Sequence, residues 1–297
     1  MMPQPRRAVT AALAALVAAV LLPWPVNAQA PYPSQPIKFI VTHPAGGLPD
    51  TVARIAARRM QERIGQTIVV ENRAGANGGI AVAAMETAAA DGYTFVVTDG
   101  TIVTINPQLY LKLPYDPKQV LPIATLAYAP MFLAVHPKVP SNTFKDFVDY
   151  VKGRPGQLNF GSSGVGSIHH LAMEALQASL HLKMTHVPYK GTGESVPALL
   201  GGHVETLFAA YPSIAGAAQQ KTIKILATSG AKRWPQAPDV PLISETIPGF
   251  DFAPLVGIFA RVGTPDAIVA KVAGVAQAVT REVEMAKAIA AAGLKAE

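Results

Sequence analysis

Short apolar runs alternate along the chain with segments whose apolar positions follow a helical spacing. Residues 37–42 are mostly apolar and β-branched, which is typical of a buried strand, and residues 44–49 form a loop rich in Pro and Gly. Downstream, apolar positions recur at intervals of three and four and predict a helix: Val52, Ile55, Ala56, Met60 and Ile64. We expect Asp50 to cap this helix and Gly65 to end it.

The same alternation continues through the first third of the chain. Strands are predicted over 67–70 and 94–98, and a second helix begins after Gly78 and Gly79 between them. A series of three strands separated by two helices implies a parallel sheet. The loops at the carboxyl ends of its strands form the natural ligand crevice.

The pattern starts again near the middle of the chain. Further strands are predicted over 131–135, 158–160, 185–187, 205–208, 223–228 and 256–260, with helices over 144–152, 167–180 and, as one or two elements, 267–292. The strand at 131–135 leaves the first α/β unit, and the strand at 256–260 returns to it. This organisation predicts an α/β fold of two lobes, joined by chain crossings near residues 131 and 251, with a ligand cleft between the lobes.

The first 28 residues have the features of a secretory signal peptide. Arg6 and Arg7 precede a run of about fifteen apolar residues, and small residues end the segment at Ala28. The run is short for a membrane span, which is the alternative interpretation. We therefore expect cleavage after Ala28 and a periplasmic protein, with 29–131 plus 251–297 as lobe 1 and 132–250 as lobe 2.

Composition excludes several classes of protein. Half of the 297 residues are apolar, 15% are charged, and no Cys is present, which excludes a disordered chain and a disulfide scaffold. Without a Cys after the signal peptide, no lipid can be attached there. Removal of 28 residues leaves 269 with a formal charge of +4 instead of +6. The basic residues are scattered, so a solvated helix face is expected and nucleic acid is not expected as a partner.

The motifs of common enzymes are missing or incomplete. Residues 161–165 lack the last Gly of a nucleophile elbow, and no phosphate-binding Gly-Lys-Ser/Thr string occurs. Residues 164–169 retain two of the three glycines of a dinucleotide fingerprint. His170 and Glu174 share a helix face, but no second ligand pair supports a closed metal site. We expect no catalysis, cofactor or metal.

Two loops are suited to binding an anion. Gly46 and Gly47 precede one predicted helix, and the Gly- and Ser-rich segment 161–167 precedes another. Glycine lets backbone N–H groups approach a ligand, hydroxyls add donors, and a helix N-terminus attracts negative charge. One such loop on each lobe predicts a carboxylate clamp. Ordinary strand-to-helix turns are the alternative interpretation.

Several sequence blocks are more specific to one protein family than the loops and motifs described above. Residues 32–47 resemble the opening of the periplasmic solute receptors of tripartite tricarboxylate transporters, known as the Bug family. The resemblance continues through the blocks 70–79, 90–94, 105–107 with 113–117, 186–191 and 199–202. It implies a two-lobe Venus-flytrap receptor of the type II periplasmic-binding-protein fold, which binds a small carboxylate and delivers it to a membrane permease.

The resemblance also implies which residues contact the ligand, through backbone N–H groups, hydroxyls and bridging waters. Carried over position by position, the expected ligand-binding residues are Ala45, Gly46, Gly47, Asp50, Thr98, Gly100, Thr101, Ser162, Ser163, Gly164, Gly166, Ser167, Tyr189, Lys190 and Ala209. Lys190 either attracts the anion or forms a structural salt bridge. Both roles are open at this stage.

Departures from the family pattern bear on the identity of the ligand. Leu48 and Pro49 replace a Gly or Thr, Ile168 and His169 replace small hydroxyl residues, and Ala209 stands where the family commonly has Asp. An aspartate there would pair with an ammonium group, so Ala209 favours a carboxylate without an amino group, partly apolar or aromatic. Alternatively, Ala209 lies beside the pocket and does not affect specificity.

The expected partners are a small organic acid and the permease subunits of a tripartite tricarboxylate transporter, with the receptor acting as a monomer. A second function is also open, in which the closed form of the receptor docks onto a signalling kinase.

Overall fold

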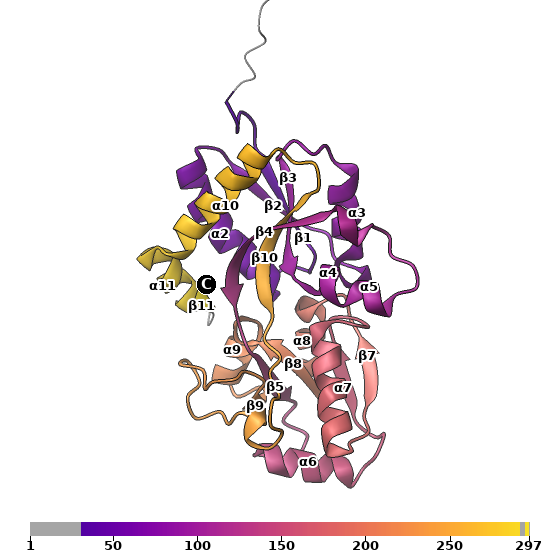
Figure 1. Cartoon of the computed structure of the whole chain (residues 1–297). Helices are drawn as coiled ribbons and strands as arrows, with labels where there is room; N and C mark the ends of the chain where they lie inside the picture. Colours follow the sequence, from indigo (N-terminus) through magenta and orange to yellow (C-terminus); the bar gives the residue numbers. More distant parts are fainter. Residues whose placement is uncertain (1–30, 292–294, 297) are drawn as a thin grey trace, which may run out of the picture. The chain divides into compact units, whose positions relative to one another are not determined.

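The computed structural model describes residues 31–291 and 295–296, so the predicted signal peptide at residues 1–28 lies outside the described part of the chain. Residues Gln35–Glu297 form one compact unit that contains two β-sheets with helices packed on them (Figure 1). We call each sheet with its helices a lobe. Within the described residues, no helix combines the length and the apolar character that a membrane crossing needs.

Lobe 1 contains a six-stranded sheet with the order β11-β4-β10-β3-β1-β2. Its strands are β1 Ile37–Val41, β2 Ile68–Asn72, β3 Thr94–Asp99, β4 Val120–Tyr128, β10 Leu255–Arg261 and β11 Lys295–Ala296. Its helices are α2 Leu48–Ile64, α3 Gly79–Thr87, α4 Thr101–Thr104, α5 Asn106–Leu109, α10 Asp266–Thr280 and α11 Val283–Ala291, with short 3₁₀ turns at Ala76–Gly78 and Pro117–Gln119.

Lobe 2 contains a five-stranded sheet with the order β7-β6-β8-β5-β9. Its strands are β5 Met131–Val135, β6 Asn159–Ser162, β7 Thr185–Pro188, β8 Thr206–Ala210 and β9 Lys224–Thr228. Its helices are α6 Phe144–Lys152, α7 Ile168–Leu180, α8 Thr192–Leu200 and α9 Tyr211–Gln219, with a 3₁₀ turn at Ile243–Glu245. The chain passes from one sheet to the other between β4 and β5 and again between β9 and β10.

The parallel pairing predicted for the first three strands is confirmed, and the strands that join them later in the chain pair antiparallel. Strand β1 pairs in parallel with β2 and β3, as the helices between them require. Strand β10 pairs antiparallel with both β3 and β4. The reason is that β4 carries the chain out of lobe 1 and β10 brings it back, so these two neighbours run in opposite directions.

Alternate side chains of the lobe 2 strands fill two hydrophobic cores. Leu133 on β5 packs with the α6 and α7 side, and Phe132 packs with the α8 and α9 side. Helix α6 shows why the local sequence folds as it does. Thr143 and Asp146 form a reciprocal capping box at its N-terminus, and its apolar residues lie on one face.

Sequence analysis missed several helices and strands, among them β4, in which Pro122 interrupts the apolar residues. The missed elements are β4, α4, α5, α8, α9 and β11. The helix expected after the first loop is present, but Asp50 does not cap it. Helix α2 begins at Leu48 with Gly47 as its N-cap, because Pro49 is favourable in the first turn of a helix.

Candidate functional site

Loops of the two lobes touch at two places. Ser213 on α9 donates a hydrogen bond from its Oγ to the carbonyl oxygen of Gly46 at 3.4 Å. The Tyr110 hydroxyl, which follows α5, donates to the carbonyl oxygen of Val165 in lobe 2. The two loops predicted to bind an anion therefore each contact the opposite lobe.

Two glycines at the start of α8 allow the first of these contacts. A Cβ atom added to Gly191 would lie 2.4 Å from Pro44 Cδ. A Cβ on Gly193 would lie 2.6 Å from the carbonyl oxygen of Ala45. Real Cβ atoms do not approach that closely, so any larger residue would push the lobes apart.

Asp50 holds the first loop in place. Its carboxylate accepts hydrogen bonds from the Gly46 N–H at 3.0 Å, from Arg54 Nε at 3.0 Å and from Asn72 Nδ2 at 2.8 Å. Burial on its own would raise the pKa of Asp50, but these hydrogen bonds and the Arg54 charge together lower it. Because both oxygens are engaged, Asp50 positions the loop instead of offering a free group to a ligand.

The four loop glycines do not present free N–H groups, contrary to the predicted backbone clamp. Each N–H already has an acceptor: Gly46 donates to Asp50, Gly47 to the Pro44 carbonyl, Gly164 to Ser162 Oγ and Gly166 to His170 Nδ1. Positive φ angles at Gly46, Gly164 and Gly166 produce the tight turns that make these bonds possible. The glycines shape the loops, and the donors for a ligand must come from elsewhere.

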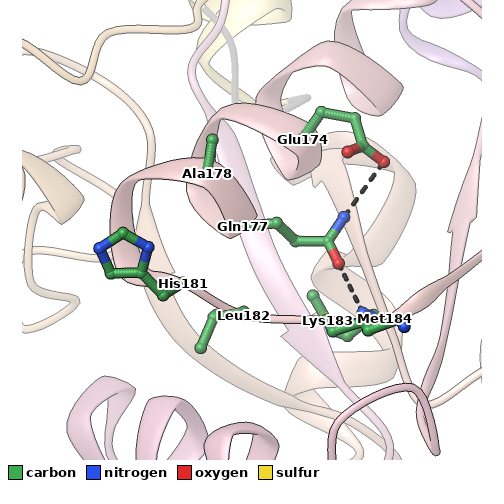
Figure 2. A pocket seen from close by; sticks show the side chains of 7 residues that line it. All are labelled: Glu174, Gln177, Ala178, His181, Leu182, Lys183 and Met184. Carbon is green, nitrogen blue, oxygen red and sulfur yellow. Dashed lines mark hydrogen bonds between the residues drawn. The ribbon is translucent and has the colours of Figure 1, made fainter.

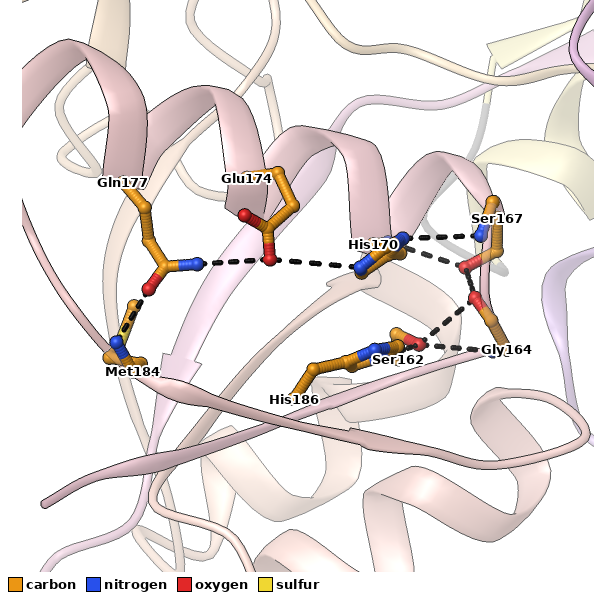
Figure 3. A network of polar contacts seen from close by, with 9 residues as sticks. Ser162, Gly164, Ser167, His170, Glu174, Gln177, Met184 and His186 are labelled. Atoms are coloured by element: carbon orange, nitrogen blue, oxygen red, sulfur yellow. Dashed lines mark hydrogen bonds and ion pairs between the residues drawn. The ribbon is translucent and has the colours of Figure 1, made fainter. Parts of the chain in front are cut away.

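A network of polar side chains supports the second loop (Figure 3). Ser162 Oγ lies 2.6 Å from His186 Nε2 and donates to the carbonyl of Gly164. Ser167 caps α7 by accepting from the His170 N–H, and its hydroxyl donates to the same carbonyl at 2.8 Å. Ser162 and Ser167, both predicted to bind ligand, are thus committed to holding the loop.

Two stacked histidines form the base of this network. The rings of His170 and His186 lie 4.0 Å apart, nearly parallel, and Phe160 continues the stack. Burial, together with the neighbouring His170, lowers the pKa of His186 to about 4. Burial also lowers the pKa of His170, although Glu174 opposes this effect. The lowered pKa values favour the uncharged form of both rings, which avoids repulsion between two stacked charges.

Among the predicted Ser and Thr residues, Ser163 alone has a buried hydroxyl with no partner within the described residues. It is 3% exposed, and its Oγ has no hydrogen-bond partner among the described residues. Thr98, by contrast, is bonded to Thr42, and Thr101 donates to Asp99 from both its N–H and its hydroxyl. A buried hydroxyl without a partner is unfavourable by about 1–3 kcal/mol, so this site is suited to receive a ligand.

His169 presents a second unpartnered polar atom. This residue lies in the first turn of α7, is 6% exposed, and its Nδ1 has no partner among the described residues. Burial and the nearby His43 lower the pKa of His169 to about 4, while Asp99 opposes them. His43 and Asp99 belong to lobe 1, so the His169 side chain faces the opposite lobe.

Sequence analysis missed Thr42, His43 and Asp99 as site residues. Each stands at or directly after the carboxyl end of a parallel strand, β1 or β3, where ligands of α/β proteins bind. That rule was available from the sequence. Thr42 and His43 lie in the block 32–47 that carries the family resemblance, but the predicted site included only the Pro- and Gly-rich loop after them, and Asp99 lies outside the blocks.

The remaining predicted residues lie around the same boundary. Tyr189 donates its N–H to the Ser162 carbonyl, and Lys190 is exposed and takes part in none of the ion pairs among the described residues. This gives no support to the salt-bridge role of Lys190. Ala209 is fully buried in the α8 and α9 core, which favours the interpretation that it does not touch the ligand. Gly100 borders a separate pocket of about 330 Å³ against β4 and β10.

A pocket of about 460 Å³ lies at the opposite end of α7 from the loop at residues 161–167. Figure 2 shows its lining side chains on the last turns of the helix and the segment after it. These are Glu174, Gln177, Ala178, His181, Leu182, Lys183 and Met184. None of the predicted ligand-binding residues lines it. Within the described residues, no group of three or more side chains is arranged to hold a metal ion.

Comparison with known proteins identifies the family to which this architecture belongs. Residues 52–296 match the family described as the tripartite tricarboxylate transporter family receptor. The UPF0065 protein in the gbd 5' region of Cupriavidus necator is 35% identical over 268 residues, which cover 90% of this chain and 80% of the relative.

Solved structures agree with this family match. The structure of R. palustris Rpa4515 with adipate has a TM-score of 0.86 and 30% identity, and it covers 89% of both chains. MatC from Rhodopseudomonas palustris with bound malate has a TM-score of 0.81 and 29% identity, covering 89% of this chain and 90% of that one.

The fold and the site define a two-lobe solute receptor of the periplasmic-binding-protein class, as predicted. The chain belongs to the tripartite tricarboxylate transporter receptor family, to which the Bug proteins also belong. Members of this family are substrate-binding proteins, so the chain is a receptor and not an enzyme.

Proposed function

We propose that this receptor captures a small organic carboxylate between its lobes in the periplasm and delivers it to the permease of a tripartite tricarboxylate transporter. Related structures with adipate and with malate support this class of ligand. In this proposal, residues 29–131 with 251–297 and residues 132–250 act as two lobes about the crossings between the sheets. The chain would reach the periplasm after cleavage behind Ala28.

The buried, unpartnered hydroxyl of Ser163 is the observation that carries the proposal. It lies on the loop that leads into α7, a helix of 13 residues. The first-turn N–H groups of Ile168 and His169 have no partner within a helix, and the helix N-terminus favours negative charge. A ligand carboxylate placed there would accept from these N–H groups and from Ser163 Oγ.

This placement differs from the clamp expected from the glycine pattern. The N–H groups of Gly46, Gly47, Gly164 and Gly166 are used within the loops. In the proposed site, the helix N-terminus and the Ser163 hydroxyl replace them as donors. The first loop would cover the ligand from lobe 1, where the Gly46 carbonyl accepts a hydrogen bond from Ser213 of lobe 2.

A thermal-shift screen of organic acids tests the proposal. An acid present at about 100 times its Kd should stabilise the folded chain by about 2.7 kcal/mol, which raises the Tm by several degrees. Dicarboxylates of different length, aromatic acids and amino acids should be included. A Ser163→Ala variant should lose most of the shift while keeping the Tm of the free protein. A screen that is flat across all carboxylates would contradict the proposed function.

A further inference from the structure

Three buried titratable side chains meet at the boundary between the lobes. His43 follows β1, Asp99 ends β3, and His169 lies in the first turn of α7, so two come from lobe 1 and one from lobe 2. They are 7%, 6% and 6% exposed. Asp99 raises the pKa of both histidines and His43 lowers that of His169, which shows that the three groups interact electrostatically. We call them the His–Asp cluster.

The cluster is only partly satisfied by the protein. His43 Nδ1 lies 2.8 Å from Thr42 Oγ1, and Asp99 Oδ1 accepts from the N–H of Thr101 at 3.0 Å and from its hydroxyl. His169 Nδ1 has no partner among the described residues, although the residue is more than nine-tenths buried. A buried imidazole nitrogen without a partner can be satisfied by a polar group of a ligand.

We propose that the His–Asp cluster is a ligand subsite that recognises a hydroxyl group on the captured carboxylate, with His169 as the specificity-determining residue. This inference rests on the proposed function, because it assigns a second contact to the same ligand. The carboxylate lies at the N-terminus of α7, and the hydroxyl group lies against His169, His43 and Asp99.

The chemistry of the cluster selects a hydroxyl over the alternatives. A second ligand carboxylate would face the negative charge of Asp99 in a buried site, where repulsion is strong. An apolar group would leave the imidazole nitrogen unsatisfied. Burial keeps both histidines neutral, so each ring offers one donor and one acceptor. A hydroxyl can accept from an imidazole N–H and donate to Asp99, whereas an ammonium group, although Asp99 attracts it, leaves an imidazole N–H that faces it without an acceptor.

Isothermal titration calorimetry with matched acids tests the subsite. Three pairs differ by one hydroxyl: succinate and malate, adipate and 2-hydroxyadipate, and 3-phenylpropionate and 3-phenyllactate. The ammonium counterparts are aspartate, 2-aminoadipate and phenylalanine. We expect the hydroxylated acid to bind about 10-fold or more tightly than its partner in at least one pair, and more tightly than the amino acid.

Variants then assign the preference to His169. His169→Leu should reduce the preference for the hydroxyl to within about 2-fold while the parent acid still binds. His169→Asn, which keeps a polar atom close to the position of Nδ1, should retain part of it. His203→Leu, at an exposed position of lobe 2, should change nothing.

Equal binding within every pair, tighter binding of the amino acids, or a hydroxyl preference that survives in His169→Leu would overturn the subsite while leaving the carboxylate receptor intact. If no acid of any kind gives heat, the proposed function fails and the subsite fails with it.

Discussion

Burial of His169 should make the ligand-free protein less stable in acid. The side chain is 6% exposed and its pKa is lowered to about 4, mainly by burial, whereas an unfolded chain has a His pKa of about 6.5. Between these values the unfolded state binds a proton that the folded state does not bind. The free energy of unfolding therefore falls as the pH is lowered from about 6.5 to about 4 and is unaffected by this group at higher pH.

The magnitude follows from the two pKa values. A difference of one between the folded and unfolded pKa corresponds to about 1.36 kcal/mol. Protonation of His169 alone should therefore lower the free energy of unfolding by about 3 kcal/mol by pH 4. That is a substantial part of the roughly 5–15 kcal/mol typical of a folded domain. The effect is large because Nδ1 has no hydrogen-bond partner among the described residues that would stabilise a charged ring.

Urea unfolding at pH 7 and pH 4 measures this difference, with the fluorescence of the buried Trp234 as the signal. The chain from Gln29 onward is compared with His169→Leu and with His203→Leu as the exposed control. The His169→Leu substitution should lower the acid-induced loss by about 3 kcal/mol relative to the unmodified chain, and the control by less than about 0.5 kcal/mol. Equal losses in all three proteins would refute the burial of a neutral His169.

Two further predictions concern the contact between the lobes. Gly193→Ala should weaken binding of any captured acid about 10-fold or more by calorimetry, because its Cβ would meet the Ala45 carbonyl at 2.6 Å. The control Gly274→Ala, in open space on α10, should leave the Kd unchanged. Equal effects of the two substitutions on the Kd would count against closure of the lobes. Asp50→Ala should lower the free energy of unfolding in urea by about 2–4 kcal/mol, because the Gly46 N–H and Arg54 lose a buried partner; a loss below about 0.5 kcal/mol would contradict the loop-holding role.

Local sequence patterns predicted the elements that bury a continuous apolar face. Strand β1 and helix α6 show this, because their apolar periodicity decides both their type and their position. Helix α9 was missed because it consists mainly of small and polar residues, and the packing of Ile214 and Tyr211 on the lobe 2 core stabilises it as a helix. The antiparallel pairing of β10 also depends on the path of the chain between sheets, which no local pattern contains.

The residues of the candidate site stay a prediction, and the structure adds how their loops are built. The loop around Gly46 contacts Ser213 of lobe 2, and the loop around Ser163 contacts Tyr110 of lobe 1. Which donors are free could not be predicted, since that depends on long-range hydrogen bonds such as the one from Asn72 to Asp50. The choice between the two interpretations of Ala209 could not be made for the same reason, because its burial depends on helices α8 and α9.

Hydrogen exchange with and without the most stabilising acid tests the central claim that one ligand is held by both lobes. The account predicts slower exchange in peptides that cover residues 43–52 of lobe 1 and residues 161–172 of lobe 2, at the same ligand concentration. Exchange of the residues that line the pocket between Glu174 and Met184 should stay unchanged. Protection confined to one lobe, or centred on that pocket, would contradict the account.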